Sequence, residues 1–423
     1  MECGAWVLCV TALGGTTIVL EHTGAHTDLV GRPLPAGGPM ILMLSLNQID
    51  PSEANDASPA PLTRAGKVVR WLWYGLVALC VLLAATALLP LLPVNWWWVR
   101  IGDFPRVQLL LAYLIVLPML IPFFRRRLSW VLGGLLLAGV GIQLYWIFPY
   151  LPVAPQEVQS AGPPQRSSRL RIVTANVLQK NTNASAVLEL IRNESPDVVV
   201  LCEVNHRWIR DLAPLDEMFP YHEKHPLENK YGIALYSRYE VTRAEVRAMV
   251  KEDIPSIDAR IRLPSGHEVR LFAVHPNPPR PGESTVKRDA ELVLVGREVR
   301  DNQSVVVLGD MNDVGWSRTT NLFQEVSGLL DPRKGRGLYP TFNARSTIWQ
   351  YPLDHLFHTD DFRVAELRTL SYIGSDHYPL LVELVYAPDA EDEQEAPDLD
   401  QGDREDAEDA VEAARAKAGT DLD

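Results

Sequence analysis

A run of apolar residues from Val305 to Leu308 ends in a short polar stretch, Gly309 to Asp313, whose residue types can do chemistry. Four consecutive apolar residues are typical of a strand that is buried on both faces. Asp310 and Asn312 lie two residues apart, so they point the same way if the extended geometry continues. A carboxylate can bind a hard cation or accept a proton, and an amide can donate to a phosphate oxygen. A strand that ends in an ordinary Asp/Asn turn gives the same pattern, so this stretch alone decides nothing.

Polar residues recur at the ends of the other predicted strands. They are Asn176, Glu203, His275, the pair Asp354 and His355, and the pair Asp376 and His377. Taken singly, each has a structural explanation as a turn residue, a helix-terminal charge or a surface residue. Central strands of one sheet would bring them together at one edge, where the sites of open sheets usually lie. Their shared position therefore favours one functional cluster.

The oxygen donors of this cluster suit a hard divalent cation. Asn176, Glu203 and Asp376 carry amide and carboxylate oxygens, which Mg²⁺ and Mn²⁺ prefer and thiolate-binding metals do not. These three residues are therefore the candidate metal ligands.

The histidines of the cluster add a second kind of chemistry. A carboxylate such as Asp354 could orient either His377 or His275. A cation, a carboxylate base and two histidines around an amide donor match phosphoester hydrolysis, because metal and histidines neutralise charge on the phosphoryl oxygens. The chain has neither the G-x-S-x-G motif of many serine hydrolases nor the HExxH motif of zinc proteases.

The elements that must position these residues begin near Arg169. The predicted strands are Leu170–Val177, Asp197–Val204, Gly232–Tyr236, Ser256–Ile261, Val269–Val274, Val305–Leu308, Asp354–Phe357 and Leu380–Val385. The predicted helices are Ala184–Glu194, Ser284–Arg300 and Arg318–Val326. Strands outnumber helices, and several follow one another directly. The pattern predicts an α+β fold or a mixed sheet sandwich and not a strictly alternating α/β fold.

Three apolar stretches precede this domain, at about Trp71–Val94, Val107–Phe124 and Leu128–Pro149. Each has about 18 residues or more without a charged side chain, which is enough to cross a bilayer. Trp96 to Trp98 follow the first stretch, at the position of an aromatic belt. We expect three transmembrane helices that serve as an anchor, because they carry no polar residues suited to a channel or transport path.

Basic residues predict the orientation of this anchor. Arg64, Lys67 and Arg70 precede the first span, and Arg125 to Arg127 lie between the second and third. The positive-inside rule places both groups in the cytoplasm. Three crossings then place everything after Pro149 outside it, which predicts a multi-pass protein of the cell (inner) membrane with an extracytoplasmic or periplasmic domain.

Composition divides the chain into five parts. Residues 1–65 look like a disordered extension or sequence before the true start, for which Met40 and Met43 are candidates; residues 66–150 form the anchor. Residues 151–168 are a Pro-rich linker that would hold the domain near the membrane, and residues 169–387 form the catalytic domain. Residues 388–423 form an acidic tail that we expect to be disordered, with at most a transient helix over Asp406 to Lys417.

Charge and cysteines exclude several classes of protein. The tail from Ala387 to Asp423 holds 15 acidic and 3 basic residues, which leaves 38 acidic and 37 basic residues in the rest of the chain. The nearly neutral body gives no bulk electrostatic signal for nucleic-acid binding. The four cysteines suggest neither a disulfide framework nor a zinc site, and Cys80 and Cys202 lie in apolar runs that predict buried thiols.

Seven short motifs occur in one order along the domain. They are TAN at 174–176, LCE at 201–203, YGIALYSR at 231–238, AVHPNPP at 273–279, GDMND at 309–313, LDHLF at 353–357 and SDHYPL at 375–380. In these motifs the domain resembles the endonuclease/exonuclease/phosphatase superfamily, the fold of DNase I, exonuclease III and neutral sphingomyelinases. The three spans resemble the membrane-attached bacterial branch of that superfamily. The resemblance implies a four-layer α/β sandwich and dependence on Mg²⁺ or Mn²⁺.

The resemblance also implies a role for each residue. Glu203 would be the principal metal ligand, supported by Asn176 and Asp376. Asp310 would orient or deprotonate the attacking water, and Asn312 would bind the scissile phosphate.

The remaining roles concern the histidines. His377 would stabilise the transition state and Asp354 would hold that histidine or help to bind metal. His275 would be a phosphate ligand or general acid, Tyr231 is a weaker candidate for a substrate contact, and His355 is expected to be structural.

We therefore expect a membrane-anchored, metal-dependent phosphoesterase that hydrolyses phosphodiester bonds, with nuclease-type activity as the family default. A phospholipid or sphingomyelin-type phosphodiesterase is the first alternative, because the tether to the membrane is short. A non-catalytic membrane receptor or scaffold that keeps the fold is the second. The substrate would be nucleic acid or phospholipid, and no obligate protein partner is inferred.

Overall fold

A computed structural model describes residues 7–11, 17–21, 63–92, 94–162, 166–278, 282–300 and 304–418. The chain divides into two compact units, Met1–Gly66 and Lys67–Asp423. In the first unit, strands β1 (Val7–Thr11) and β2 (Thr17–Glu21) pair antiparallel. The predicted disorder near residues 50–61 and the candidate starts Met40 and Met43 lie outside the described residues.

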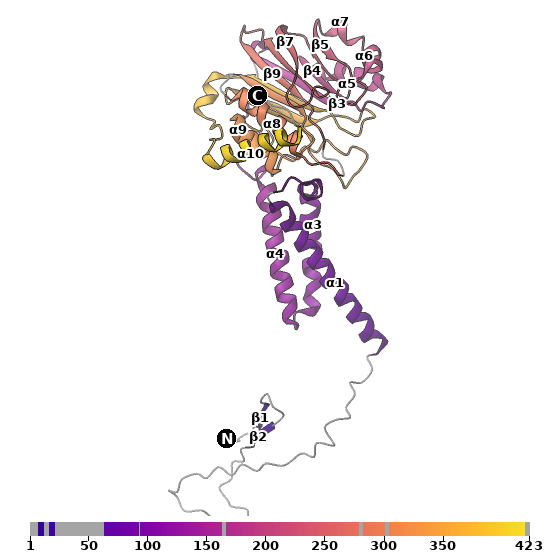
Figure 1. Ribbon diagram of the computed structural model, residues 1–423, viewed down its shortest axis with the longest axis vertical. Helices are drawn as coiled ribbons and strands as arrows, with labels where there is room; N and C mark the ends of the chain where they lie inside the picture. Colours follow the sequence, from indigo (N-terminus) through magenta and orange to yellow (C-terminus); the bar gives the residue numbers. More distant parts are fainter. Residues whose placement is uncertain are drawn as a thin grey trace, which may run out of the picture. The chain divides into compact units, whose positions relative to one another are not determined.

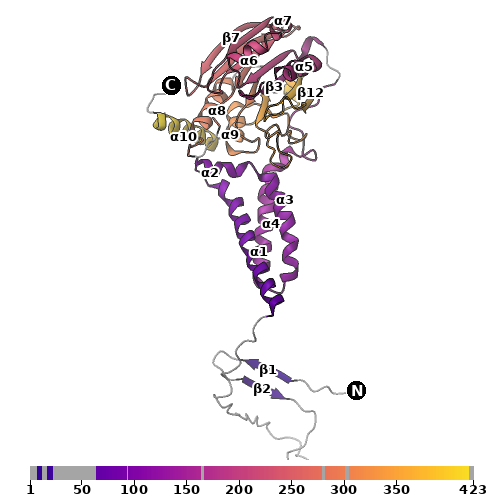
Figure 2. The same ribbon diagram turned by 90° about the vertical axis from the view of Figure 1, so that its right-hand side faces the viewer.

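The second unit begins with three long apolar helices that lie side by side in Figures 1 and 2. The candidate spans are Arg64–Leu91, Arg106–Phe123 and Arg127–Tyr150, by length and composition. Apolar side chains such as Leu82, Ile115 and Val131 are more than half exposed on them, as expected of surfaces that face lipid.

These spans are built from several helical elements in sequence. They are α1 (Arg64–Leu88), η1 (Leu89–Leu91), α2 (Trp97–Arg100), η2 (Ile101–Asp103), α3 (Arg106–Val116), η3 (Leu117–Phe123), α4 (Arg127–Ile147) and η4 (Phe148–Tyr150). The short elements α2 and η2 form the turn between the first two spans. That turn contacts the domain that follows.

Two mixed β-sheets form the centre of the domain that follows. The first has the strand order β12 (Phe362–Thr369), β13 (Leu380–Tyr386), β3 (Arg169–Asn176), β4 (Val198–Cys202), β6 (Ile233–Ser237) and β5 (Tyr221–His225). The second has the order β11 (Asp354–His358), β10 (Val305–Asp310), β9 (Glu268–Val274), β8 (Pro255–Arg262) and β7 (Glu240–Ala248). Only the central pairs β3–β4 and β9–β10 are parallel.

The sheets pack face to face and are covered by helices on their outer faces. Side chains such as Val200 and Leu271 meet in the core between the sheets. Helices α5 (Ala184–Glu194), α6 (His206–Asp211) and α7 (Leu215–Met218) cover the first sheet. Helices α8 (Val286–Val299) and α9 (Arg318–Ser327) cover the second. The predicted four-layer α/β sandwich of the α+β class is confirmed.

All eight predicted strands and all three predicted helices are present. In the two sheets of the domain, the strands that the sequence did not predict, β5, β7 and β12, are edge strands. Residues such as Glu240, Arg243 and Glu245 give β7 a charged surface, as is common where an unpaired edge must be protected from further pairing. Charged edge strands lack the apolar run or strict alternation on which a strand prediction depends.

The segments that flank the domain contact it more closely than the sequence predicted, and the prediction of a disordered tail was wrong. The linker packs on the domain: Val158 is buried in the core between the sheets, and Ser160 pairs with Val364, before the turn η5 (Arg166–Ser168). After η6 (Pro388–Asp392), the tail forms the helix α10 (Gln401–Ala418), which packs on α8 and α9. Asp406 of α10 pairs with Arg318 of α9, and the rest of this packing comes from apolar residues at helical spacing, which the acidic average of the tail conceals. They are Ala407, Ala410, Val411 and Ala414.

Candidate active site

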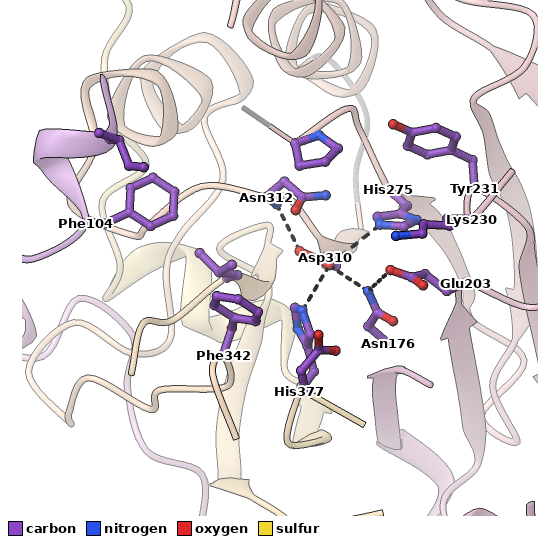
Figure 3. A pocket seen from close by; sticks show the side chains of 14 residues that line it. Phe104, Asn176, Glu203, Lys230, Tyr231, His275, Asp310, Asn312, Phe342 and His377 are labelled. Atoms are coloured by element: carbon purple, nitrogen blue, oxygen red, sulfur yellow. Dashed lines mark hydrogen bonds and ion pairs between the residues drawn. The ribbon is translucent and has the colours of Figure 1, made fainter. Parts of the chain in front are cut away.

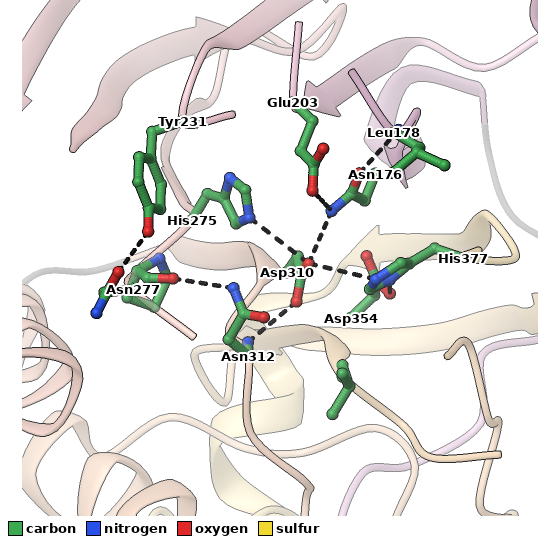
Figure 4. Close-up of polar contacts among 12 residues, drawn as sticks. Asn176, Leu178, Glu203, Tyr231, His275, Asn277, Asp310, Asn312, Asp354 and His377 are labelled. Carbon is green, nitrogen blue, oxygen red and sulfur yellow. Dashed lines mark hydrogen bonds and ion pairs between the residues drawn. The ribbon is translucent and has the colours of Figure 1, made fainter. Parts of the chain in front are cut away.

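The polar residues that follow the strands lie together at one edge of the two sheets (Figure 4). The parallel strands β3 and β4, and likewise β9 and β10, end at this edge, while the antiparallel strands β11 and β13 begin there. A cavity of about 350 Å³ lies at this edge. Its walls include eight of the predicted residues, namely Asn176, Glu203, Tyr231, His275, Asp310, Asn312, Asp376 and His377.

Asp310 is the hub of the cluster. Its Oδ2 accepts a hydrogen bond from Asn176 Nδ2 at 3.0 Å and lies 3.6 Å from both His275 Nε2 and His377 Nε2. Its Oδ1 accepts from the backbone N–H of Asn312 at 3.0 Å. The carboxylate is buried, so these contacts fix its position at the floor of the cavity (Figure 3).

His377 is held on its far side by Asp354, which does not line the cavity. The distance from His377 Nδ1 to Asp354 Oδ2 is 2.7 Å. Burial alone would lower the pKa of His377, but attraction to Asp354 and Asp310 outweighs burial and raises the pKa to about 10. At neutral pH this imidazole is therefore a cation that presents Nε2–H toward Asp310 and the cavity.

His275 and Asn312 lie on the side of Asp310 that is opposite to His377 (Figure 4). Nδ1 of His275 is buried without a hydrogen-bond partner. The Asn312 amide donates to the carbonyl oxygen of Pro276 at 2.9 Å, which joins the end of β10 to the loop after β9. The Tyr231 hydroxyl donates to Asn277 Oδ1, so the predicted Tyr231 is fixed at the cavity by a neighbour that the sequence did not single out.

The backbone is strained at this edge of the sheets. Glu203 and Asn312 have φ values of +62° and +52°, a region that residues with a Cβ seldom adopt. Gly309 has a φ of +136°, and a Cβ there would lie 2.0 Å from the carbonyl oxygen of Val274. Only glycine therefore lets β10 approach β9 so closely just before Asp310.

The donor set of the cavity fits a hard divalent cation. Glu203, Asp310 and Asp376 bring carboxylates to its walls, and among the described residues none of the three forms an ion pair with a lysine or arginine. Carboxylates without a basic partner in a partly buried site favour a cation. The residues present therefore fit the Mg²⁺ or Mn²⁺ that the sequence implied.

Two placements of that ion can be compared. Asp310, Asp354 and His377 offer ligand atoms within 4.8 Å of one another, but Asp354 lies behind His377, to which it is bonded, and does not line the cavity. We therefore favour the side of Glu203 and Asp376. Asn176 departs from its predicted role, because its Oδ1 accepts from the backbone N–H of Leu178 and its Nδ2 faces Asp310 and Glu203. Its amide would have to turn before it could bind a cation.

Residues 173–377 match the model of the Endonuclease/Exonuclease/phosphatase family. The domain belongs to this family. Three similar solved structures are the humanized D. rerio TDP2 with 14 mutations, the human Nocturnin catalytic domain with a bound sulfate anion, and the endonuclease/exonuclease/phosphatase from Bacteroides vulgatus. The first is 15% identical with a TM-score of 0.45, over 52% of this chain and 99% of that chain.

The other two structures give similar values. The second is 16% identical with a TM-score of 0.44, over 53% of this chain and 96% of that chain. The third is 17% identical with a TM-score of 0.43, over 52% of this chain and 99% of that chain. No curated protein matches the chain.

His355 of the endonuclease/exonuclease/phosphatase domain has the structural position that we expected. Its Nε2 lies 2.8 Å from the carbonyl oxygen of Asp313, and its side chain is fully buried. Burial, helped by the nearby Arg333 cation, lowers the pKa of His355 to about 3. The residue is therefore neutral and holds the loop after β10.

Several residues of the site escaped the sequence analysis. Arg288 of α8 is buried, donates to the carbonyl oxygen of Asn312 at 3.1 Å and forms an ion pair with Asp313 at 3.0 Å. Nothing in the helical pattern of α8 separates this arginine from a solvated one. Ile101 and Phe104 line the cavity from the turn between the first two spans, where no motif marks them.

Proposed function

We propose that this protein is a membrane-anchored, divalent-metal-dependent hydrolase of phosphodiester bonds. The observation that carries the proposal is the environment of Asp310, a buried carboxylate that faces two histidines across 3.6 Å at the floor of a cavity. Binding alone does not require that arrangement, which disfavours a non-catalytic receptor or scaffold. Nuclease-type activity is the default that the family implies.

Asp310 orients the attacking water and accepts its proton as the water oxygen bonds to phosphorus. His377, kept cationic by Asp354, donates to a phosphoryl oxygen as negative charge develops there. The ester P–O bond breaks, and His275 gives a proton to the leaving oxygen, so that a phosphomonoester and an alcohol are released. Asn312 fixes the position of the phosphate between these groups.

Glu203 and Asp376 are the residues that would hold the ion, with Asn176 after its amide turns. A divalent ion held there would neutralise charge on the phosphoryl group and would lower the pKa of the attacking water. The hydrogen bond from the backbone N–H of Gln179 to Glu203 Oε2, at 3.0 Å, fixes the orientation of this ligand.

The chain's basic residues support an extracytoplasmic catalytic domain. The domain packs against the turn after the first span and the end of the third, where Gly335 N–H donates to the carbonyl oxygen of Pro149 at 2.7 Å. Arg125 to Arg127 lie in the opposite turn, and the positive-inside rule assigns that turn to the cytoplasm. A reporter fused after Asp423 should be active only outside the cytoplasm, and cytoplasmic activity would contradict the orientation.

Turnover of bis-p-nitrophenyl phosphate by the full chain in detergent tests the reaction. Activity should require Mg²⁺ or Mn²⁺, disappear in EDTA and be lost in Asp310→Ala. Glu240→Gln, at an exposed carboxylate on the edge strand β7, is the matched control and should retain it. Equal turnover in EDTA, or in Asp310→Ala, would refute the proposed function.

A further inference from the structure

One wall of the catalytic cavity comes from the membrane anchor. Ile101 and Phe104, in the turn between the first two spans, line the cavity together with Phe342 and Leu353. Figure 3 places Phe104 and Phe342 on one side of the cavity, apart from Glu203 and Lys230. The cavity therefore has a polar floor that suits a phosphate and an apolar side wall.

Specific contacts join this turn to the catalytic loops. The buried Trp316, six residues after Asp310, donates through its indole N–H to the carbonyl oxygen of Asp103 at 2.8 Å. Phe104 packs edge-on against Tyr351 with a centroid distance of 5.5 Å. These contacts hold the turn against the catalytic loops, so the apolar wall is a fixed part of the site.

The turn that lines the cavity leads directly into the second candidate span, Arg106–Phe123. Gln108, in the first turn of α3, donates to the carbonyl oxygen of Ile348 at 2.7 Å. Ile348 and Trp349, in the loop between Phe342 and Tyr351, are 66% and 54% exposed. Large apolar side chains exposed beside the first turn of a span are suited to the interface of a bilayer.

The charges of the lining do not suit a nucleic acid. Among the described residues, Lys230 is the only lysine or arginine on the cavity walls. Nucleic-acid binding depends on rows of basic residues that follow the phosphate backbone. A cavity with one apolar wall, lined by the turn that leads into a candidate membrane span, instead suits a phosphate that is attached to a membrane lipid.

We propose that Ile101 and Phe104 are substrate-binding residues and that they select a phospholipid of the same bilayer. The lipid places its phosphodiester on the floor beside Asp310, while the parts of its acyl chains nearest the glycerol contact this wall and the rest of the chains remains in the membrane. Hydrolysis releases a phosphomonoester and an alcohol, as written above. The inference rests on the proposed function and adds the substrate class.

The test uses the full chain in mixed micelles that contain phosphatidylethanolamine, phosphatidylglycerol and phosphatidylcholine. The same three headgroups as deacylated glycerophosphodiesters, and a single-stranded oligonucleotide, are the comparison substrates. We expect a higher kcat/KM on the lipids than on the deacylated compounds, because apolar contact adds binding energy. Ile101→Ser/Phe104→Ser should lower kcat/KM on the lipids about tenfold to a hundredfold, a much larger loss than on the deacylated compounds.

Two further variants separate binding from folding. Trp98→Ser removes an exposed aromatic of the same turn that does not line the cavity, and it should behave as the wild type. Phe104→Leu keeps an apolar wall and should retain most of the lipid turnover. Equal losses on lipid and deacylated substrates, or faster cleavage of the oligonucleotide than of any lipid, would overturn the substrate class alone. Metal-independent turnover of bis-p-nitrophenyl phosphate would instead overturn the proposed function.

Discussion

Two of the acidic clusters in the domain differ in what neutralises them. In the outer cluster, Arg270 Nη2 lies 2.7 Å from Asp258 and 2.6 Å from Glu298, and Arg247 also pairs with Glu298. In the cavity, Glu203, Asp310 and Asp376 form no such pair within the described part of the chain. Arginine-paired acids stabilise the fold, whereas acids left without a basic partner are available to a cation and a substrate.

The pKa values follow the same division. Burial would raise the pKa of Asp258, but the hydrogen bond and charge of Arg270 outweigh burial and lower it. A third case is Glu291 of α8, which is buried and has one carboxylate oxygen without a hydrogen-bond partner. Burial alone raises its pKa to about 8, so it is mainly neutral at pH 7.

The largest expected effect is on catalysis, at Asp310. Asp310→Asn removes the water-orienting base, and we expect turnover to fall by about 10³-fold or more. The melting temperature should stay the same or rise, because a buried charge that served function is gone. Kinetics and thermal unfolding of the full chain measure both quantities. A large loss of stability would show that Asp310 stabilises the fold, as the arginine-paired acids do.

The next effect is on stability, at Arg270. Arg270→Ala removes one of the two arginines that pair with Asp258 and Glu298, and we expect unfolding to cost about 2–3 kcal/mol less, near the lower limit for breaking a buried ion pair. Turnover per folded molecule should not change. Arg262→Ala, in the exposed pair with Glu240, is the control and should cost at most about 1 kcal/mol.

A smaller, pH-dependent effect is expected at Glu291. Because its folded pKa is raised, the native state binds the extra proton and stability falls as pH rises from about 4.5 to about 8. Glu291→Gln should therefore match the wild type at pH 4.5 and exceed it by about 1–3 kcal/mol at pH 8.5. Denaturant unfolding at the two pH values measures the difference, and an equal effect at both would show that Glu291 is not buried as an acid.

The sequence predicted the catalytic cluster because each member follows or precedes a buried apolar strand. Asp310 at the end of β10 and Glu203 after β4 are typical. The run of apolar residues predicts each buried strand, and the end of that strand determines where the polar side chain lies. The motif order then implied the four-layer sandwich. The role of each group remained undecided. The amide of Asn176 is an example, because its direction depends on a hydrogen bond from the backbone N–H of Leu178.

The apolar wall of the cavity could not be predicted in this way. Phe104 lies about 70 residues before the first motif, and the tertiary contact of Asp103 with Trp316 brings it to the site. The burial of Arg288 could not be predicted for the same reason, because its partners Asn312 and Asp313 lie on a different element. In α10, four apolar residues at helical spacing outweigh the many acids around them, which composition alone cannot reveal.

Mn²⁺ binding to the full chain in detergent tests most directly whether the unpaired carboxylates of the cavity hold a cation. Electron paramagnetic resonance would measure free Mn²⁺ with the wild type, Glu203→Gln and the outer-cluster control Asp258→Asn. We expect saturable binding that Glu203→Gln weakens about tenfold or more and that Asp258→Asn leaves unchanged. Absence of binding, or equal binding by all three proteins, would contradict a metal site in this cavity.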